Sequence, residues 1–282
     1  MSTLEPLETL YEAQQGADLP LPPNLAALYG RLSFPVRSNQ PYVIGNFVTT
    51  LDGVVSLSVP GQSGGGPISG FNQHDRMVMG LLRAVADAVI VGAGTLRAVP
   101  QHLWTAEYVY PALAEEYRHL SSVLEKAGPP LNVIVTARGT IDLGLPVFQS
   151  GDVPVLIVTT QEGAQRIRTH ALPPLVQVAA VQRAGALSAQ AILEAVSAVH
   201  QSDIILLEGG PQLMGDFFAE QRLDELFLTL APQIAGRDET LDRPGLVTGK
   251  RFAPEQPIWG RLAGIKRGGS HLFLRYAFDA AG

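Results

Sequence analysis

The sequence predicts an α/β protein with a mostly parallel central sheet, helices on both faces and an antiparallel hairpin at one edge. Short, unbroken Val/Ile/Leu runs alternate with helical segments, and several of these runs end in glycine. Strands that are apolar on both faces are typical of parallel sheets covered by helices. Near the C-terminus, two extended runs flank Gly268-Gly269, which predicts the closing hairpin.

The individual elements follow from local patterns. Tyr42 to Leu51 is β-branched and aromatic and stops at Asp52-Gly53, a turn signal, so it is the first predicted strand. Further strands are expected at 87–92, 131–136, 153–159, 176–181, 204–207 and 224–231, and the hairpin within 259–278. Helices are expected at 73–86, 111–127, from the end of 153–159 through 170, at 188–200, and from 211 to 221.

Residues 1–40 differ from the rest and are interpreted as an N-terminal extension to a single domain at 41–282. Leu4 to Gln15 is predicted to form a short helix, which the proline-rich segment 19–23 ends. The pattern leaves open whether this extension wraps around the domain or contacts a second subunit.

Composition excludes several classes of function. The 282 residues are 46% apolar, which is enough to bury a core, but no run approaches the roughly 18 apolar residues of a membrane span. Met1 to Leu10 lacks the basic and apolar regions of a secretory signal, so we expect a soluble, cytoplasmic protein. The absence of cysteine excludes disulfides, thiolate metal sites and a cysteine nucleophile.

Charge and motif spacing narrow the choice further. The net charge is −6 and no run of Lys/Arg exists, which disfavours a nucleic-acid partner. The six histidines show neither H-x-x-x-H nor H-E-x-x-H spacing, and no metal is expected. No G-x-S-x-G elbow is present, which disfavours an α/β-hydrolase. This pattern suits a fold in which a cofactor supplies the chemistry.

Two glycine-rich junctions between a strand and a helix are the candidate ligand sites. They are VGAGT at 91–95 and EGGP at 208–211. Glycine lets backbone N–H groups approach an anion at a helix N-terminus, and ligands of open α/β sheets bind beyond the carboxyl ends of the strands. Each junction is also compatible with a plain tight turn, and neither is a full G-x-G-x-x-G or P-loop motif. A third glycine-rich stretch, 60–66, is either a surface loop or a close approach to a ligand.

Four segments together resemble a known family. They are TTLDG at 49–53, LRA followed by DAVIVGAGT within 82–95, LEGGP at 207–211, and DEL followed by APQI and Gly236 within 224–236. In this order they resemble the reductase domain of the bifunctional deaminase–reductase of riboflavin biosynthesis, over approximately 40–278. The resemblance implies a dihydrofolate-reductase-like fold and a homodimer. It also implies NADPH-dependent reduction of 5-amino-6-(5-phosphoribosylamino)uracil to its ribitylamino form.

The zinc deaminase that accompanies this reductase in the bifunctional proteins needs cysteine ligands, which this sequence lacks. The expectation is therefore a free-standing reductase or a relative of one. The apolar run 272–274 is compatible with a dimer contact and equally with packing inside one subunit.

The resemblance also implies the residues of the site. Cofactor-binding positions carried over are Val48, Thr49, Asp52, Gly92, Gly94, Thr95, Thr136, Arg138, Gly209, Gly210, Leu213 and Met214. Of these, Arg138 is expected near the 2′-phosphate of NADPH. Arg83 is expected to face the substrate phosphate, and Glu208 the polar groups of its ring or ribose. Ordinary roles stay open for these three: a solvated helix residue, a helix cap for Glu208, and a turn residue for Arg138.

One segment departs from the family. After Thr95, relatives carry an acidic pair before a proline and then an arginine, whereas this sequence reads LRAVPQHLW at 96–104. We expect Arg97 or His102 to replace the missing phosphate contact. The change leaves the substrate open, so a reductase of another heterocycle such as a pterin, or a non-catalytic nucleotide-binding relative, remains an alternative. No catalytic residue or proton donor is assigned.

Overall fold

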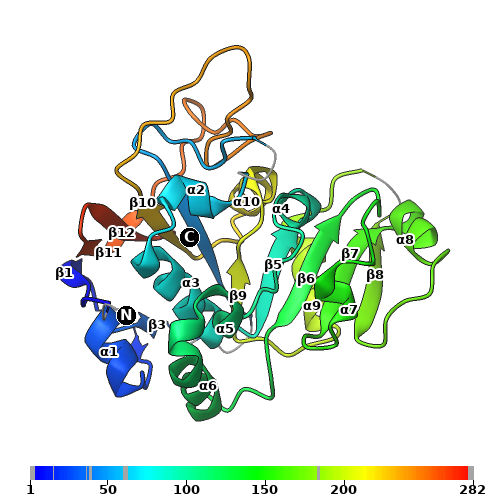
Figure 1. Ribbon diagram of the computed structural model, residues 1–282. Helices are drawn as coiled ribbons and strands as arrows, with labels where there is room; N and C mark the ends of the chain where they lie inside the picture. The colour runs from blue at the N-terminus through cyan, green and yellow to red at the C-terminus, as the bar shows by residue number, and fades with distance from the viewer. Residues whose placement is uncertain are drawn as a thin grey trace.

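The computed structural model describes residues 4–14, 16–35, 37, 40–59, 63–182 and 185–278. Its main sheet has ten strands in the order β1-β11-β12-β10-β4-β9-β5-β6-β7-β8 (Figure 1). Their bounds are β1 Glu8–Glu12, β4 Tyr42–Thr49, β5 Ala88–Gly92, β6 Leu131–Thr136, β7 Val155–Thr160, β8 Val176–Gln182, β9 Ile204–Leu207, β10 Glu225–Leu230, β11 Arg261–Gly268 and β12 His271–Ala277.

The strands from β10 to β8 pair in parallel, and β12, β11 and β1 continue the sheet in antiparallel pairs. This arrangement confirms the predicted fold class, including the C-terminal hairpin. The strand β12 is hydrogen-bonded to strands on both sides, and of residues 272–274 Phe273 is buried in the core while Leu272 and Leu274 are half-buried.

Helices cover both faces of the sheet. The described helices are α1 Pro23–Tyr29, α2 Gly65–Ser69, α3 Gln73–Val85, α4 Ala93–Ala98, α5 Ala106–Val109, α6 Ala114–Val123, α7 Pro146–Gln149, α8 Gln161–Ile167, α9 Ala189–Ser197 and α10 Pro211–Ala219, with a 3₁₀ turn at Pro111–Leu113 and a small hairpin of β2 Ala17–Asp18 with β3 Ser33–Phe34. None of them has the length and apolarity that a membrane crossing requires.

Each face of the sheet has its own core. Val89 and Val91 of β5 pack toward the core that includes the buried side chains of α3 and α6. Ile90, between them, packs in the core with α9 and α10. This alternation follows from the period of two along a strand, and it explains why the strand is apolar throughout. The expected two-sided burial therefore comes from two separate helical layers.

The predicted helix from Leu4 to Gln15 is wrong. Glu8–Glu12 instead forms β1, which pairs with β11 and widens the sheet by one strand; Gln15 itself lies outside the described residues. A helix this short has little stability by itself in water. The open edge of β11 offers the same residues a ladder of backbone hydrogen bonds, so a partner about 250 residues away in the chain overrides the local pattern.

Candidate functional site

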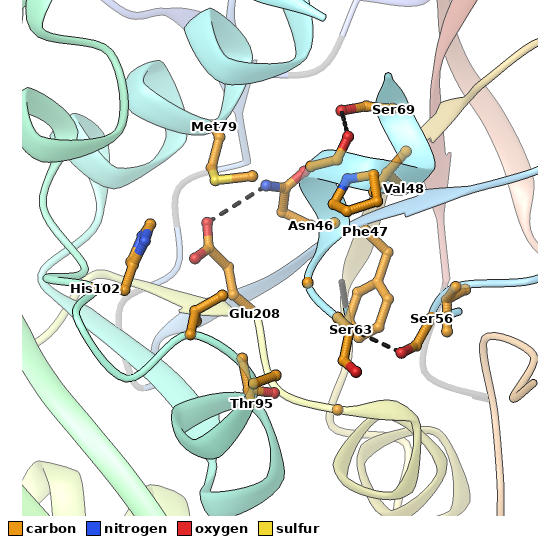
Figure 2. A pocket seen from close by; sticks show the side chains of 18 of the residues that line it. Asn46, Phe47, Val48, Ser56, Ser63, Ser69, Met79, Thr95, His102 and Glu208 are labelled. Atoms are coloured by element: carbon orange, nitrogen blue, oxygen red, sulfur yellow. Dashed lines mark hydrogen bonds between the residues drawn. The ribbon is translucent and has the colours of Figure 1, made fainter. Parts of the chain in front are cut away.

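A cavity of about 610 Å³ lies at the carboxyl ends of β4, β5 and β9, a size typical of small-molecule sites. Its walls come from β4, residues 55–58 and 63–71, α3, α4 with the following loop, and the junction before α10 (Figure 2). The residues that line it are Asn46, Phe47, Val48, Val55, Ser56, Ser58, Ser63, Gly64, Gly65, Gly66, Pro67, Ser69, Phe71, Asp75, Arg76, Met79, Arg83, Gly94, Thr95, Ala98, Val99, His102, Trp104, Tyr108, Val109, Glu208, Gly209, Gly210, Pro211 and Pro244.

The two glycine junctions meet at one end of this cavity. The helix α4 begins directly after β5, and α10 begins with Pro211 at its first turn after Gly210. A Cβ at Gly209 would lie 2.7 Å from Leu213 Cδ1 and 3.3 Å from the backbone nitrogen of Gly92, so the two chains approach closely because this position has no side chain. At Gly94 a Cβ would meet nothing within 4 Å. The backbone here therefore borders open space.

A buried ion pair between Arg83 and Glu208 forms part of the cavity wall. Arg83, on α3, donates from Nη2 to Glu208 Oε2 at 2.6 Å and from Nε to both carboxylate oxygens at 3.1 and 3.2 Å. The exposed fractions of the two side chains are 2% and 7%. Asn46 donates to Glu208 at 3.4 Å. The carboxylate is therefore fixed by two elements, and the pair is neither a solvated helix residue nor a simple helix cap.

His102 is held against the other side of the same guanidinium. Arg83 Nη1 lies 2.9 Å from His102 Nε2, so this nitrogen accepts and the ring carries its proton on Nδ1. Burial, together with the charges of Arg83 and Arg76, lowers the pKa of His102 to about 2. Trp104 and Tyr108 pack around the ring with centroids 5.2 and 4.7 Å away. His102 is therefore a neutral imidazole at physiological pH and offers a ligand no positive charge.

The structure brings half of the carried-over residues together. Those that line the cavity are Val48, Arg83, Gly94, Thr95, His102, Glu208, Gly209 and Gly210. Those that do not line it are Thr49, Asp52, Gly92, Arg97, Thr136, Arg138, Leu213 and Met214. Their binding roles stay predictions in both groups.

Several of the second group have a structural position instead. Asp52 accepts hydrogen bonds from the hydroxyl of Thr50 and from the backbone of Ala235 and Gly236, which lower its pKa to about 2 and fix the turn after β4. Leu213 packs over the glycine junctions and Met214 is fully buried. Thr136 is buried and Arg138 exposed at the end of β6. Arg97 is exposed on α4.

The described part of the glycine-rich stretch, for which the sequence left two alternatives open, forms part of the cavity wall. The glycine-rich stretch enters α2, where a Cβ at Gly65 would lie 3.0 Å from Val48 Cγ1, so 64–66 is a close approach of backbone to the cavity; residues 60–62 lie outside the described residues. Asn46, Ser56 and Ser63 were not singled out, although they lie among the labelled side chains of Figure 2. The run of glycines was the available signal, because only close packing makes such a run useful.

Asp75 is a further buried acid that the sequence did not single out. It lies in the first turn of α3 and is buried near the hydroxyls of Thr229 and Ser69. Burial raises its pKa, while these hydroxyls and the charge of His271 act against that change. Over the described ranges, no group of three or more His, Asp or Glu residues is arranged to hold a metal ion.

The fold and this cavity define the class first: an α/β protein with a cavity of small-molecule size at the carboxyl ends of parallel strands. Comparison with protein families then identifies the family within that class. Residues 41–256 match the model of the RibD C-terminal domain, so the chain belongs to this family of reductases in riboflavin biosynthesis. The family expected from the sequence is therefore confirmed.

Individual relatives agree with this family. The riboflavin biosynthesis protein RibD of Aquifex aeolicus is 23% identical over 213 residues, which cover 75% of this chain and 52% of that protein. The chain thus spans about half the length of the curated relative that it matches. A pyrimidine reductase-like protein of Corynebacterium diphtheriae has the same fold, with a TM-score of 0.67, 20% identity, and coverage of 86% of this chain and 94% of that one.

The deaminase/reductase of Thermotoga maritima aligns with a TM-score of 0.61 and 19% identity, over 86% of this chain and 57% of that one. At these identities the structural comparisons establish the shared fold.

Proposed function

We propose that this chain uses NADPH to reduce 5-amino-6-(5-phosphoribosylamino)uracil to the ribitylamino compound. One observation carries the proposal: a single cavity has the glycine junctions of β5 and β9 at one end and the Arg83–Glu208 pair beside them. The first feature suits a nucleotide, and the second suits a polar heterocycle or sugar. Membership of the RibD C-terminal family supports this assignment.

The residues present fit a dinucleotide. The helix α10 begins beside the cavity, at Pro211 after Gly210, and no side chain caps its first turn; helix N-termini of this kind bind phosphate oxygens. The open space beside Gly94 leaves room for a planar ring at the same end. When bound, NADPH would supply a hydride, and the glycine junctions at Gly94 and Gly209 would hold it beside the substrate.

The protein contributes position and electrostatics to this reaction. Hydride reaches C1′ of the ribosyl group, the C1′–O4′ bond breaks, and O4′ takes up a proton, so that one proton is consumed for each NADPH oxidised. Glu208, fixed by Arg83 and Asn46, offers carboxylate oxygens to ring N–H or ribose hydroxyl groups. The apolar parts of the wall, which include Val48 and Met79, exclude water from the reacting atoms.

The test is oxidation of NADPH followed at the nicotinamide absorbance band, with and without the pyrimidine. We expect loss of NADPH that depends on the pyrimidine, with a much slower reaction from NADH. Gly94→Leu places a side chain in the open space and should raise the KM for NADPH at least about tenfold. Gly128→Leu is the matched control, because that exposed glycine also has open space around it but lies away from the cavity.

Two results would contradict the proposal. If NADPH binds but is not oxidised, the chain is either a nucleotide-binding protein or a reductase of another heterocycle. Trials with pterins would distinguish these two alternatives. If NADPH does not bind, the glycine junctions are plain turns without a role in cofactor binding.

The homodimer is part of the same proposal. The outermost strand, β1, leaves one of its edges without a strand partner and has Leu10 and Tyr11 about half exposed. An open edge with apolar side chains suits pairing with a second copy. Light scattering behind a sizing column should give twice the 30.1 kDa mass of the chain, and Leu10→Lys should shift the mass toward the monomer.

A further inference from the structure

Arg76 is a cation at the cavity that no predicted role uses. It lies in the first turns of α3, is exposed, and lines the cavity together with Met79 and Arg83. Its Nε donates to the backbone oxygen of Val109 at 2.9 Å, which orients the guanidinium. In the part of the chain that the structure describes, no acidic side chain pairs with it, so both terminal nitrogens are free to bind an anion.

Arg83, the other arginine of the cavity, already uses most of its donors inside the protein. Its Nη1 contacts His102 and the backbone oxygens of Leu103 and Thr105, while Nε and Nη2 donate to Glu208. A bidentate contact with a phosphoryl group would take donors away from this buried pair, and that is costly because Glu208 would lose part of the contact that offsets its charge. The expected contact of Arg83 with the substrate phosphate is therefore disfavoured.

Among the described residues that line the cavity, Arg76 is a cation without an acidic partner. Arg83 is matched by Glu208, and His102 is neutral. Asp75 also lines the cavity but is buried, and burial raises its pKa. The positive charges of Arg83 and Arg76 both lower the pKa of His102, so the two guanidinium groups lie near the same part of the cavity. An anionic group is thus attracted to the Arg76 end.

The position of Arg76 along α3 suits a substrate with a phosphate at one end. Arg76 and Arg83 are seven residues apart on one helix face, which corresponds to roughly 10 Å along the axis. Met79 lies between them on that face. A heterocycle or sugar held beside Glu208 therefore has its far end near Arg76 when its reacting carbon faces the glycine junctions. Arg97 lacks this geometry, because it does not line the cavity.

We propose that Arg76 binds the phosphoryl group of the sugar-phosphate substrate, as the bidentate anchor that the altered loop after Thr95 no longer supplies. The inference rests on the proposed reduction of a phosphoribosyl compound. The planar guanidinium matches two phosphate oxygens, and its preset orientation by Val109 reduces the entropy lost on binding.

The kinetic test compares the phosphorylated pyrimidine with the same compound after removal of its phosphate. Arg76→Met keeps most of the apolar stem and removes the charge. We expect the KM for the phosphorylated substrate to rise about 10- to 100-fold with kcat nearly unchanged, and the kinetics of the dephosphorylated compound to stay as they are. Arg76→Lys should restore part of the loss. Arg118→Met is the matched control, because Arg118 is exposed on α6 outside the cavity and its Nε also donates to a backbone oxygen; it should change the kinetics of neither substrate.

Equal losses for both substrates, or no loss for either, would overturn the inference. A thermal unfolding curve of Arg76→Met that matches the unmodified protein excludes a folding defect as the cause of any change.

A second measurement separates this inference from the proposed function. The sequence holds two tryptophans, of which Trp104 lies in the cavity wall and Trp259 is 84% exposed. In a Trp259→Phe background, titration with ribose 5-phosphate should change Trp104 fluorescence, and the added change Arg76→Met should weaken that binding about tenfold or more. If this holds while no pyrimidine is reduced, the anion site stands and the proposed reaction fails. If reduction is observed and both proteins bind ribose 5-phosphate equally, Arg76 is not the anchor.

Discussion

Two buried Arg–Glu pairs in this molecule have nearly the same local geometry and different surroundings. Arg83–Glu208 and Arg275–Glu225 each have a closest N–O distance of 2.6 Å, and each of the four side chains is at most 7% exposed. The first pair lines the cavity. The second lies where β10, β12 and the N-terminal segment meet.

The surroundings of the second pair are closed. The guanidinium of Arg275 stacks on Phe227 at 4.7 Å and on Phe34 at 5.7 Å, and it donates to the backbone oxygen of Ser33. Tyr42 donates to Glu225 at 3.3 Å. The pair therefore fastens the N-terminal segment to the sheet, with its polar atoms used inside the protein.

The difference shows that burial of an ion pair does not by itself indicate function. Both pairs carry a desolvation cost, and both need the second charge to offset it. What distinguishes Glu208 is that its carboxylate borders open space beside a neutral imidazole and an amide. A ligand with polar groups can reach the first pair and not the second. The variants below test that distinction.

The largest expected effect is the loss of the closed pair. Arg275→Met leaves Glu225 buried without its cation, so the free energy of unfolding should fall by about 3–5 kcal/mol. The kcat of the protein that remains folded should not change. Urea denaturation and NADPH oxidation at low temperature measure the two quantities. A variant that stays as stable as the unmodified protein would show that the pair is not needed to hold the N-terminal segment.

The cavity pair should respond in the opposite way. Glu208→Gln preserves shape and removes the carboxylate, so kcat/KM should fall about 100-fold or more because ligand groups lose a charge-assisted hydrogen bond. Stability should fall by only about 1–3 kcal/mol, since water in the cavity reaches the unpaired guanidinium. Glu225→Gln is the matched control, with a loss of stability and unchanged kinetics. If Glu208→Gln instead lost only stability and Glu225→Gln lost activity, the assignment of the first pair to the ligand site and of the second to stability would be wrong.

The third prediction concerns the pH dependence of stability. The pKa of His102 is about 2 in the folded protein and returns to about 6.5 on unfolding. The unfolded chain then binds more protons between these values, so stability is lost as pH falls below about 6.5, by at most about 1.4 kcal/mol for each pH unit. His102→Gln should show a shallower decline in urea midpoints measured between pH 7 and 5. Equal slopes would mean that Arg83 and Arg76 do not keep the ring neutral.

The smallest effect is expected from Tyr42→Phe, which removes one hydrogen bond from the closed pair. The free energy of unfolding should fall by about 1 kcal/mol, because Glu225 keeps Arg275 and loses only the phenol. Kinetic constants should be the same as in the unmodified protein. A change in KM would indicate that the two pairs communicate through β4, which carries Tyr42 at its start and Asn46 and Val48 toward the cavity.

Much of the fold was predictable from local patterns. The strand 131–136 and the start of the helix at 73 agree with β6 and α3, because continuous apolar runs and a helical stripe are properties of neighbouring residues. The glycine junctions at 91–95 and 208–211 were also visible. A glycine allows close approach of the backbone whichever segment or ligand lies opposite, so this signal does not depend on the tertiary structure. Gly94, Gly209 and Gly210 do line one cavity.

The sequence by itself thus determined the parallel core, the family and the glycine end of the cavity. The tertiary structure decided the rest: that Glu8–Glu12 is an edge strand, that Glu208 holds Arg83 across 125 residues of chain, and that Arg76 lines the cavity without an acidic partner among the described residues. The physical reason is that strand pairing and ion pairing depend on which groups meet in space. Local propensity and motif spacing do not show which groups come close together in the folded chain.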